Sequence, residues 1–143
     1  AQTWISNTSY ITSLYIWDSW NKLYYADYND STRRQVPLST PYDISTAGTA
    51  TTVNINNYYR GIGFSSDGKY VFLNNSDWSW SYGTIYQYEL ATAWDLTSTK
   101  TQASTYTATW WEWCAFWISD DMKYRTWSTW SASSYNVTIY NTY

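Results

Sequence analysis

The stretch FSSDGKYVFLNNSDWSWSYGTIYQYELATAWDLTST, Phe64–Thr99, combines a polar turn, a strand-like alternation and many aromatic rings. Its turn, Ser66-Asp67-Gly68, is made of residues that tolerate left-handed or side-chain-bonded backbone conformations. Apolar and polar residues alternate over Thr84–Leu90, which is typical of a half-buried strand. The stretch ends on the tag Ala93-Trp94-Asp95, followed by threonine and serine. This order of turn, strands and tag predicts antiparallel β-structure.

The composition of the whole chain agrees with that prediction. Aromatic residues make up 22% of its 143 residues and charged residues 13%, against about a quarter charged in an average domain. Tyr, Trp and Thr favour strands over helices. The net charge of −3 argues against a nucleic-acid partner, because phosphate binding relies on clusters of Lys and Arg. The basic pair Arg33-Arg34 is interpreted as part of a solvated edge strand.

Residues for common catalytic and metal sites are scarce. The chain has no histidine and a single cysteine, Cys114, so neither a Ser-His-Asp triad nor a thiolate metal cluster is expected. Residues 27–30 read as a hairpin turn rather than a calcium loop. We therefore predict a protein without catalytic residues, metal or cofactor. A hydrolase with paired carboxylates, tested by Glu112→Gln, is the minor enzymatic alternative.

The opening stretch is one copy of an internal repeat. A polar turn, a lysine and an apolar strand recur around Lys22, Lys69 and Lys123. The tag recurs as well, because residues 38–46 match residues 90–98 at an offset of 52 with an aromatic-Asp-aliphatic centre in both. Three copies at a period of about 50 predict a repeat architecture. We expect one domain, 1–143, with repeats at about 1–47, 48–99 and 100–143.

Each copy is expected to contain four strands. They fall at about 2–6, 12–17, 22–27 and 32–36; 51–55, 61–64, 70–74 and 84–90; and 104–109, 113–118, 123–127 and 136–143. No stretch approaches the roughly 20 apolar residues that span a bilayer, so no membrane span is expected.

The middle copy resembles a known repeat. "GFSSDGKYVFL…IYQYELATAWDLTST" looks like the β-propeller repeat of phage and marine bacterial proteins, with the pattern F-S-x-D-G…Y-x-L-S-T-A-W-D-x-S-T, akin to NHL-type and WD-type blades. The likeness covers Gly63–Thr99 well and Ile16–Thr46 in part, whereas Phe116–Tyr143 departs most and lacks the final tag. The resemblance implies a fold rather than a function. It implies an all-β, propeller-like chain of three four-stranded antiparallel repeats.

Three blades do not close a ring, since propellers have 4–8. We therefore expect a half-propeller that is completed by a head-to-tail homo-oligomer, with a β-trefoil or a fragment of a longer propeller as alternatives. Self-association would use the two ends of the chain, namely Gln2, Trp4, Ile139 and Tyr143. The tag and turn residues Asp43, Asp67, Gly68, Trp94 and Asp95 are assigned a structural role, with carboxylates bonded to backbone N–H groups.

The expected function is a non-catalytic structural or adhesive module of an extracellular or virion assembly, such as a fibre, decoration or filament subunit. The alternative is a lectin-like, carbohydrate-binding propeller whose rings stack on sugars. Surplus aromatic residues in a polar loop mark such a surface. The candidate glycan platform consists of Asp77, Trp78, Trp80, Tyr82, Trp127 and Trp130.

Overall fold

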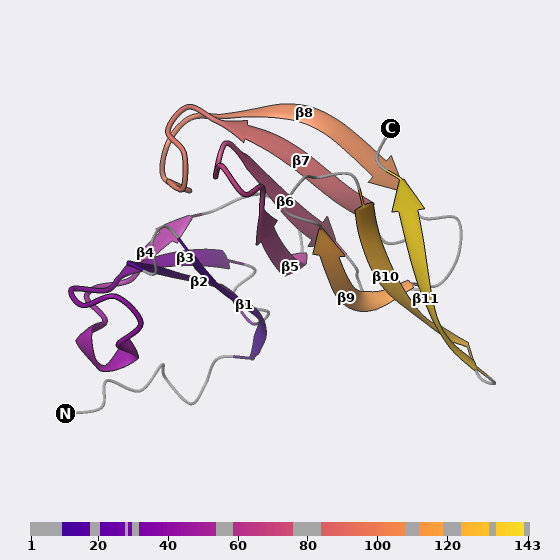
Figure 1. Cartoon of the computed structure of the whole chain (residues 1–143), viewed down its shortest axis with the longest axis horizontal. Helices are drawn as coiled ribbons and strands as arrows, with labels where there is room; N and C mark the ends of the chain where they lie inside the picture. Colours follow the sequence, from indigo (N-terminus) through magenta and orange to yellow (C-terminus); the bar gives the residue numbers. More distant parts are fainter. Residues whose placement is uncertain are drawn as a thin grey trace.

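The computed structural model describes residues 10–17, 21–27, 29, 32–53, 59–75, 84–107, 112–118, 124–131 and 134–141, with side chains described for most residues up to Thr107. These residues form three antiparallel sheets that follow one another along the chain, from β1–β4 at the left of Figure 1 to β9–β11 at its right. The all-β prediction is confirmed. In the part of the chain that is described, no helix is long and apolar enough to cross a membrane.

The first sheet contains β1 (Ile11–Trp17), β2 (Lys22–Asp27), β3 (Thr32–Pro37) and β4 (Thr51–Val53), hydrogen-bonded in that order. The second contains β5 (Tyr59–Phe64), β6 (Tyr70–Asn75), β7 (Thr84–Leu90) and β8 (Lys100–Thr107), also in chain order. The third contains β9 (Glu112–Ile118), β10 (Tyr124–Ser131) and β11 (Ser134–Asn141). A 3-10 turn, η1 (Ile44–Thr46), follows β3.

The prediction of three four-stranded, propeller-like repeats is wrong, and so is the β-trefoil alternative, because only two sheets of the described chain have four strands. The described strands fall close to their expected positions, whereas the strand expected at 2–6 lies outside the described residues, and the grouping differs. The segments at 51–55 and 104–109 were expected to open the second and third repeats. In the structure, β4 instead pairs with β3 and β8 pairs with β7. Each therefore closes the preceding sheet, and the third sheet is left with three strands.

The main core lies between the first and second sheets. Alternation along β5 and β6 turns one apolar face of the second sheet toward the first. Its buried members are Tyr24, Val53, Ile62, Phe64, Val71, Leu73, Leu90, Trp94 and Leu96. A second cluster, Leu23, Tyr25, Val36 and Leu38, covers the opposite face of the first sheet, which we call the outer face.

Aromatic rings form the centre of the main core. The Phe64 ring lies 4.5 Å from the Tyr24 ring and 5.2 Å from the Trp94 ring, measured between centroids. Tyr15 stacks on Trp94 at 6.5 Å. Such ring pairs add about 0.5–1.5 kcal/mol each beyond the burial of their apolar area. The high aromatic content of the chain is thus used in part to hold two sheets together.

Candidate functional site

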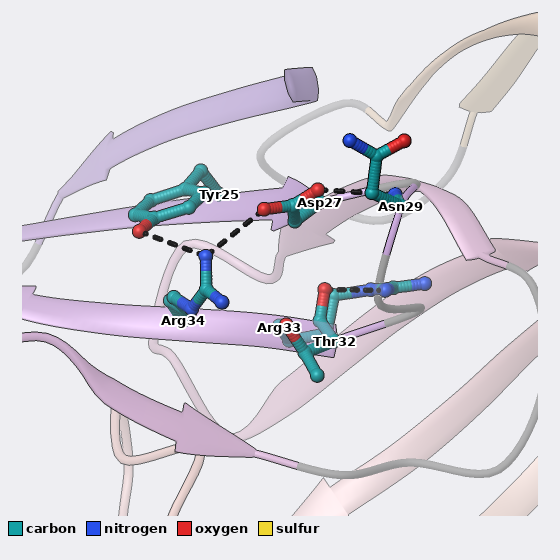
Figure 2. A network of polar contacts seen from close by, with 6 residues as sticks. All are labelled: Tyr25, Asp27, Asn29, Thr32, Arg33 and Arg34. Atoms are coloured by element: carbon teal, nitrogen blue, oxygen red, sulfur yellow. Dashed lines mark hydrogen bonds and ion pairs between the residues drawn. The ribbon is translucent and has the colours of Figure 1, made fainter. Parts of the chain in front are cut away.

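A buried polar network lies where β2 and β3 meet at their hairpin end (Figure 2). Asp27, only 2% exposed, accepts a hydrogen bond from the backbone N–H of Asn29 at 3.1 Å. Its other carboxylate oxygen lies 2.9 Å from a terminal nitrogen of Arg34, forming an ion pair. The same nitrogen of Arg34 donates to the Tyr25 hydroxyl at 3.4 Å. The Arg34 guanidinium is therefore fixed by a carboxylate and a phenol.

The pleat of the strands explains which residues meet. Residues two apart on a strand share a face, so Tyr25 and Asp27 point the same way, and the register places Arg34 opposite Tyr25. The Arg34 guanidinium carbon lies 5.7 Å from the centre of the Tyr25 ring, within cation–π range. Arg33 belongs to the opposite face, is fully buried and donates to the Thr32 carbonyl at 2.8 Å. One arginine thus lies on each face of the first sheet.

This network was missed by the sequence analysis. The interpretation of Arg33-Arg34 as part of a solvated edge strand is wrong, because β3 lies between β2 and β4 and Arg33 has no exposed surface. The alternation Tyr25-x-Asp27 on the partner strand is the signal that could have indicated it. Within the described part of the chain, no group of three or more His, Cys, Asp or Glu residues could hold a metal ion.

The chemistry available at the network is recognition of an anion. A guanidinium is planar and always charged, and it binds carboxylate or phosphate oxygens in a fixed geometry. Arg34 retains 21% side-chain exposure, whereas Asp27 is shielded at 2%. The exposed part of Arg34 can therefore contact a ligand, and Asp27 holds the Arg34 guanidinium in position. Burial between protein and ligand strengthens such a charge-assisted bond.

The two tags have the same geometry. In each loop an Asp carboxylate accepts from the residue two positions later, from Ser45 N–H to Asp43 at 2.9 Å and from Thr97 N–H to Asp95 at 2.9 Å. The preceding aromatic residue has a left-handed backbone in both, with φ of 66° at Tyr42 and 61° at Trp94. A bulky residue rarely adopts this region, so the surrounding hydrogen bonds maintain it.

The turn carboxylates have lowered pKa values. Hydrogen bonds from the Ser45 hydroxyl and N–H lower the pKa of Asp43, and the Ser65 hydroxyl lowers the pKa of Asp67. Burial alone would raise the pKa of Asp95, but hydrogen bonds from the Thr97 hydroxyl and N–H outweigh it and leave that pKa lowered.

These shifts predict acid sensitivity of the fold. A carboxyl whose pKa is lower in the folded chain stabilises it above the unfolded pKa, here 3.8, and this contribution disappears as the pH falls through the folded value. We expect the urea midpoint to fall between about pH 5 and pH 2, and to fall less in the variant D43N/D67N/D95N. The same loss in both proteins would contradict the assignment.

The residues predicted for other sites are placed as follows. Asp77, Trp78, Trp80 and Tyr82, and likewise Gln2, Trp4 and Tyr143, lie outside the described residues. Trp127 and Trp130 belong to β10, and Ile139 belongs to β11. Glu112 is the first residue of β9. The glycan platform and the self-association ends therefore stay predictions.

Comparison with known proteins finds one relevant fold. No family model matches the chain, and no curated protein matches it. Among solved structures, a candidate 6-phosphogluconolactonase from Bacteroides uniformis matches 93% of this chain with a TM-score of 0.58 and 16% sequence identity. The chain spans 37% of the length of that protein. The likeness shows a shared fold.

This likeness corrects three predictions. The similar structure is named for a lactonase, not for a propeller, a fibre or a virion protein. The prediction of a non-catalytic structural or adhesive module, and with it the lectin-like propeller, is therefore wrong, because the fold is shared with a protein named for a lactonase. The prediction that the chain is not an enzyme is overturned by the same finding. The absence of histidine from the chain does not by itself decide between an enzyme and a binding module, because a fold can hold a site built from other residues.

Proposed function

We propose that the chain is part of an enzyme that hydrolyses the cyclic ester of an anionic sugar. The fold shared with the Bacteroides protein over 93% of the chain carries this proposal. The polar network supports it, since Arg34 is fixed beside Asp27 at 2.9 Å and keeps an exposed portion. A phosphate or carboxylate on the sugar suits a planar guanidinium.

In this role Arg34 binds the anionic group and Asp27 orients Arg34. Hydrolysis adds water to the ester carbonyl and breaks the ring C–O bond, which gives a carboxylate and a hydroxyl. The anion bound at Arg34 fixes the distance of the ring from the attacking water, which is the contribution that positioning makes to a rate. Tyr25 limits the rotation of the guanidinium through its hydroxyl and its ring.

The test compares a phosphorylated with an unphosphorylated sugar lactone. We expect hydrolysis of 6-phosphogluconolactone above the buffer rate, and an increase in KM of about tenfold, or about 1.4 kcal/mol, in Arg34→Gln. KM for gluconolactone should not change in that variant, because it has no anion to lose. Asp43→Asn, in an exposed turn, is the matched control.

Binding of the product gives an independent readout. Calorimetric titration with 6-phosphogluconate is expected to show binding by the unmodified chain and about tenfold weaker binding by Arg34→Gln. Equal affinity in the two proteins, together with no hydrolysis above buffer, would overturn the proposal.

The predicted partners and location rest on the sequence alone. A head-to-tail homo-oligomer, a glycan partner and an extracellular or virion-surface location stay predictions from the sequence.

A further inference from the structure

Asp67 is followed by Gly68, and no other aspartate in the sequence precedes a glycine. A glycine leaves its backbone nitrogen accessible, because it has no side chain to hinder the approach of the preceding carboxyl. Such a nitrogen can bond to the aspartate side-chain carbon and form a cyclic imide. The tag aspartates Asp43 and Asp95 precede isoleucine and leucine instead, whose side chains crowd the nitrogen.

The reaction is a dehydration followed by a hydrolysis. The Gly68 nitrogen forms a bond to the Asp67 side-chain carbon, the bond from that carbon to the carboxyl hydroxyl breaks, and the hydroxyl leaves with the amide proton as water. Water then adds to one of the two imide carbonyls, and a carbon–nitrogen bond breaks. Opening at the main-chain carbonyl leaves the backbone running through the Asp67 side chain, which is an isoaspartate. Water is the only co-reactant.

The folded turn engages both reacting groups in other interactions. The Gly68 N–H donates to the Ser65 carbonyl at 2.9 Å. One Asp67 carboxylate oxygen accepts from the Ser65 hydroxyl at 2.7 Å and from the Lys69 N–H at 3.0 Å. Ser65 is only 1% exposed, and its hydroxyl also accepts from the Tyr70 N–H at 3.0 Å. The nitrogen and the carboxylate are therefore fixed until these hydrogen bonds open.

The charge of the Asp67 carboxyl acts in the same direction. Imide formation needs the neutral carboxyl, because a carboxylate has no hydroxyl to release. The hydrogen bond from the Ser65 hydroxyl lowers the pKa of Asp67 in the folded chain, which reduces the neutral fraction at neutral pH. An open turn loses this hydrogen bond, so the pKa returns toward its ordinary value and the neutral fraction rises.

The contact with Trp94 determines what isomerisation does to the fold. A Cβ on Gly68 would overlap the Trp94 ring, so the ring lies directly against this glycine. The Trp94 N–H also donates to the Gly68 carbonyl at 2.9 Å. An isoaspartate lengthens the backbone before Gly68 by one carbon and so shifts the glycine relative to both the ring and the N–H.

We propose that the Asp67–Gly68 bond is an isomerisation site that the folded turn protects, and that isomerisation of the open turn prevents Trp94 from regaining its contact with Gly68. The protecting hydrogen bonds join residues two to five positions apart, so the turn can open without unfolding the sheets. The inference goes beyond lactone hydrolysis and does not depend on it, because no residue of the turn belongs to the Arg34 network.

The test is peptide mapping of the chain after incubation at neutral pH, with isoaspartate detected by enzymatic carboxyl methylation. We expect isoaspartate at Asp67 to form at least about tenfold more slowly in the folded chain than in chain kept unfolded in urea. Ser65→Ala removes the hydroxyl and should raise the folded rate about fivefold. Ser66→Ala, in the exposed part of the same turn, should leave it unchanged, and Asp95 is the internal control.

Circular dichroism shows whether Ser65→Ala folds. If it does not, the unmodified chain is incubated in urea below its unfolding midpoint, where the rate should rise with urea concentration. The isomerised chain, separated by ion exchange, is expected to unfold at a lower urea concentration than the unmodified chain, because it has lost the Trp94 contact.

Three results would overturn the proposal. The first is an unfolded chain that forms no isoaspartate at Asp67. The second is a rate that does not respond to the turn, namely equal rates in folded and unfolded chain, a folded Ser65→Ala no faster than the unmodified chain, or no dependence on urea. The third is an isomerised chain that unfolds at the same urea concentration as the unmodified one.

Discussion

Replacing Gly68 with alanine is expected to destabilise the fold by about 3 kcal/mol. Gly68 has a φ of 69°, a left-handed conformation that costs a residue with a Cβ about 1–2 kcal/mol. An added Cβ would also overlap the Trp94 ring, and overpacking of a core costs about 1–3 kcal/mol. The Trp94 N–H donates to the Gly68 carbonyl at 2.9 Å, so the backbone cannot move away without losing that bond.

The measurement is urea unfolding followed by tryptophan fluorescence. Gly48→Ala is the matched control, because its Cβ would meet only the Pro37 side chain, at 3.1 Å, and its carbonyl at 3.5 Å. That variant is expected to change stability by less than about 1 kcal/mol. If both variants unfolded at the same urea concentration, the proposed contact between the turn and Trp94 would be wrong.

Replacing Asp27 with asparagine should cost about 3 kcal/mol of stability. The change leaves the Arg34 guanidinium beside a neutral amide in a buried network, and removing one partner of a buried ion pair costs about 3–5 kcal/mol. Arg34 keeps 21% exposure, which places the expectation at the lower end. Lys69→Ala breaks the exposed pair with Asp67, at 3.8 Å, and should cost less than about 1 kcal/mol.

A second variant separates the ion pair from general packing. In D27N/R34M neither charge is left alone, so we expect part of the stability lost in Asp27→Asn to return. Chemical denaturation of the unmodified chain, of the single variants Asp27→Asn and Arg34→Met, and of the double variant gives the coupling energy between the two residues. If the double variant lost the sum of the two single losses, the pair would contribute no interaction of its own.

The turn around Gly68 and the network around Asp27 depend on interactions of different range. The turn around Gly68 is local, and its residues predict it, because Ser66-Asp67-Gly68 lies between two aromatic runs. The network around Asp27 joins β2 to β3 and depends on register. A pattern along one strand places Tyr25 and Asp27 on a common face, but it does not say which residue of another strand lies opposite.

The glycine turn and the tags show how far local sequence reaches. Their hydrogen bonds connect residues two to six positions apart, such as Ser65 to Asp67 and Thr92 to Ser98. Contacts of this range depend on side-chain length and backbone preference, which the residue type sets. The burial of a tag does not follow from its local conformation. Trp94 is 9% and Tyr42 67% exposed, although their loops have the same conformation.

The sequence by itself determined the β-class, the approximate strand positions and the two tag turns, since alternation and turn chemistry act between near neighbours. Only the tertiary structure decided that β4 and β8 close the preceding sheets and that Arg33 is buried. It also set the correspondence between the first two sheets. Asn21, rather than Lys22, corresponds to Lys69, because the Leu38 N–H donates to the Asn21 carbonyl as the Leu90 N–H donates to the Lys69 carbonyl. The physical reason is that strand partners and burial depend on hydrogen bonds and contacts between segments distant in the chain, which no local pattern encodes.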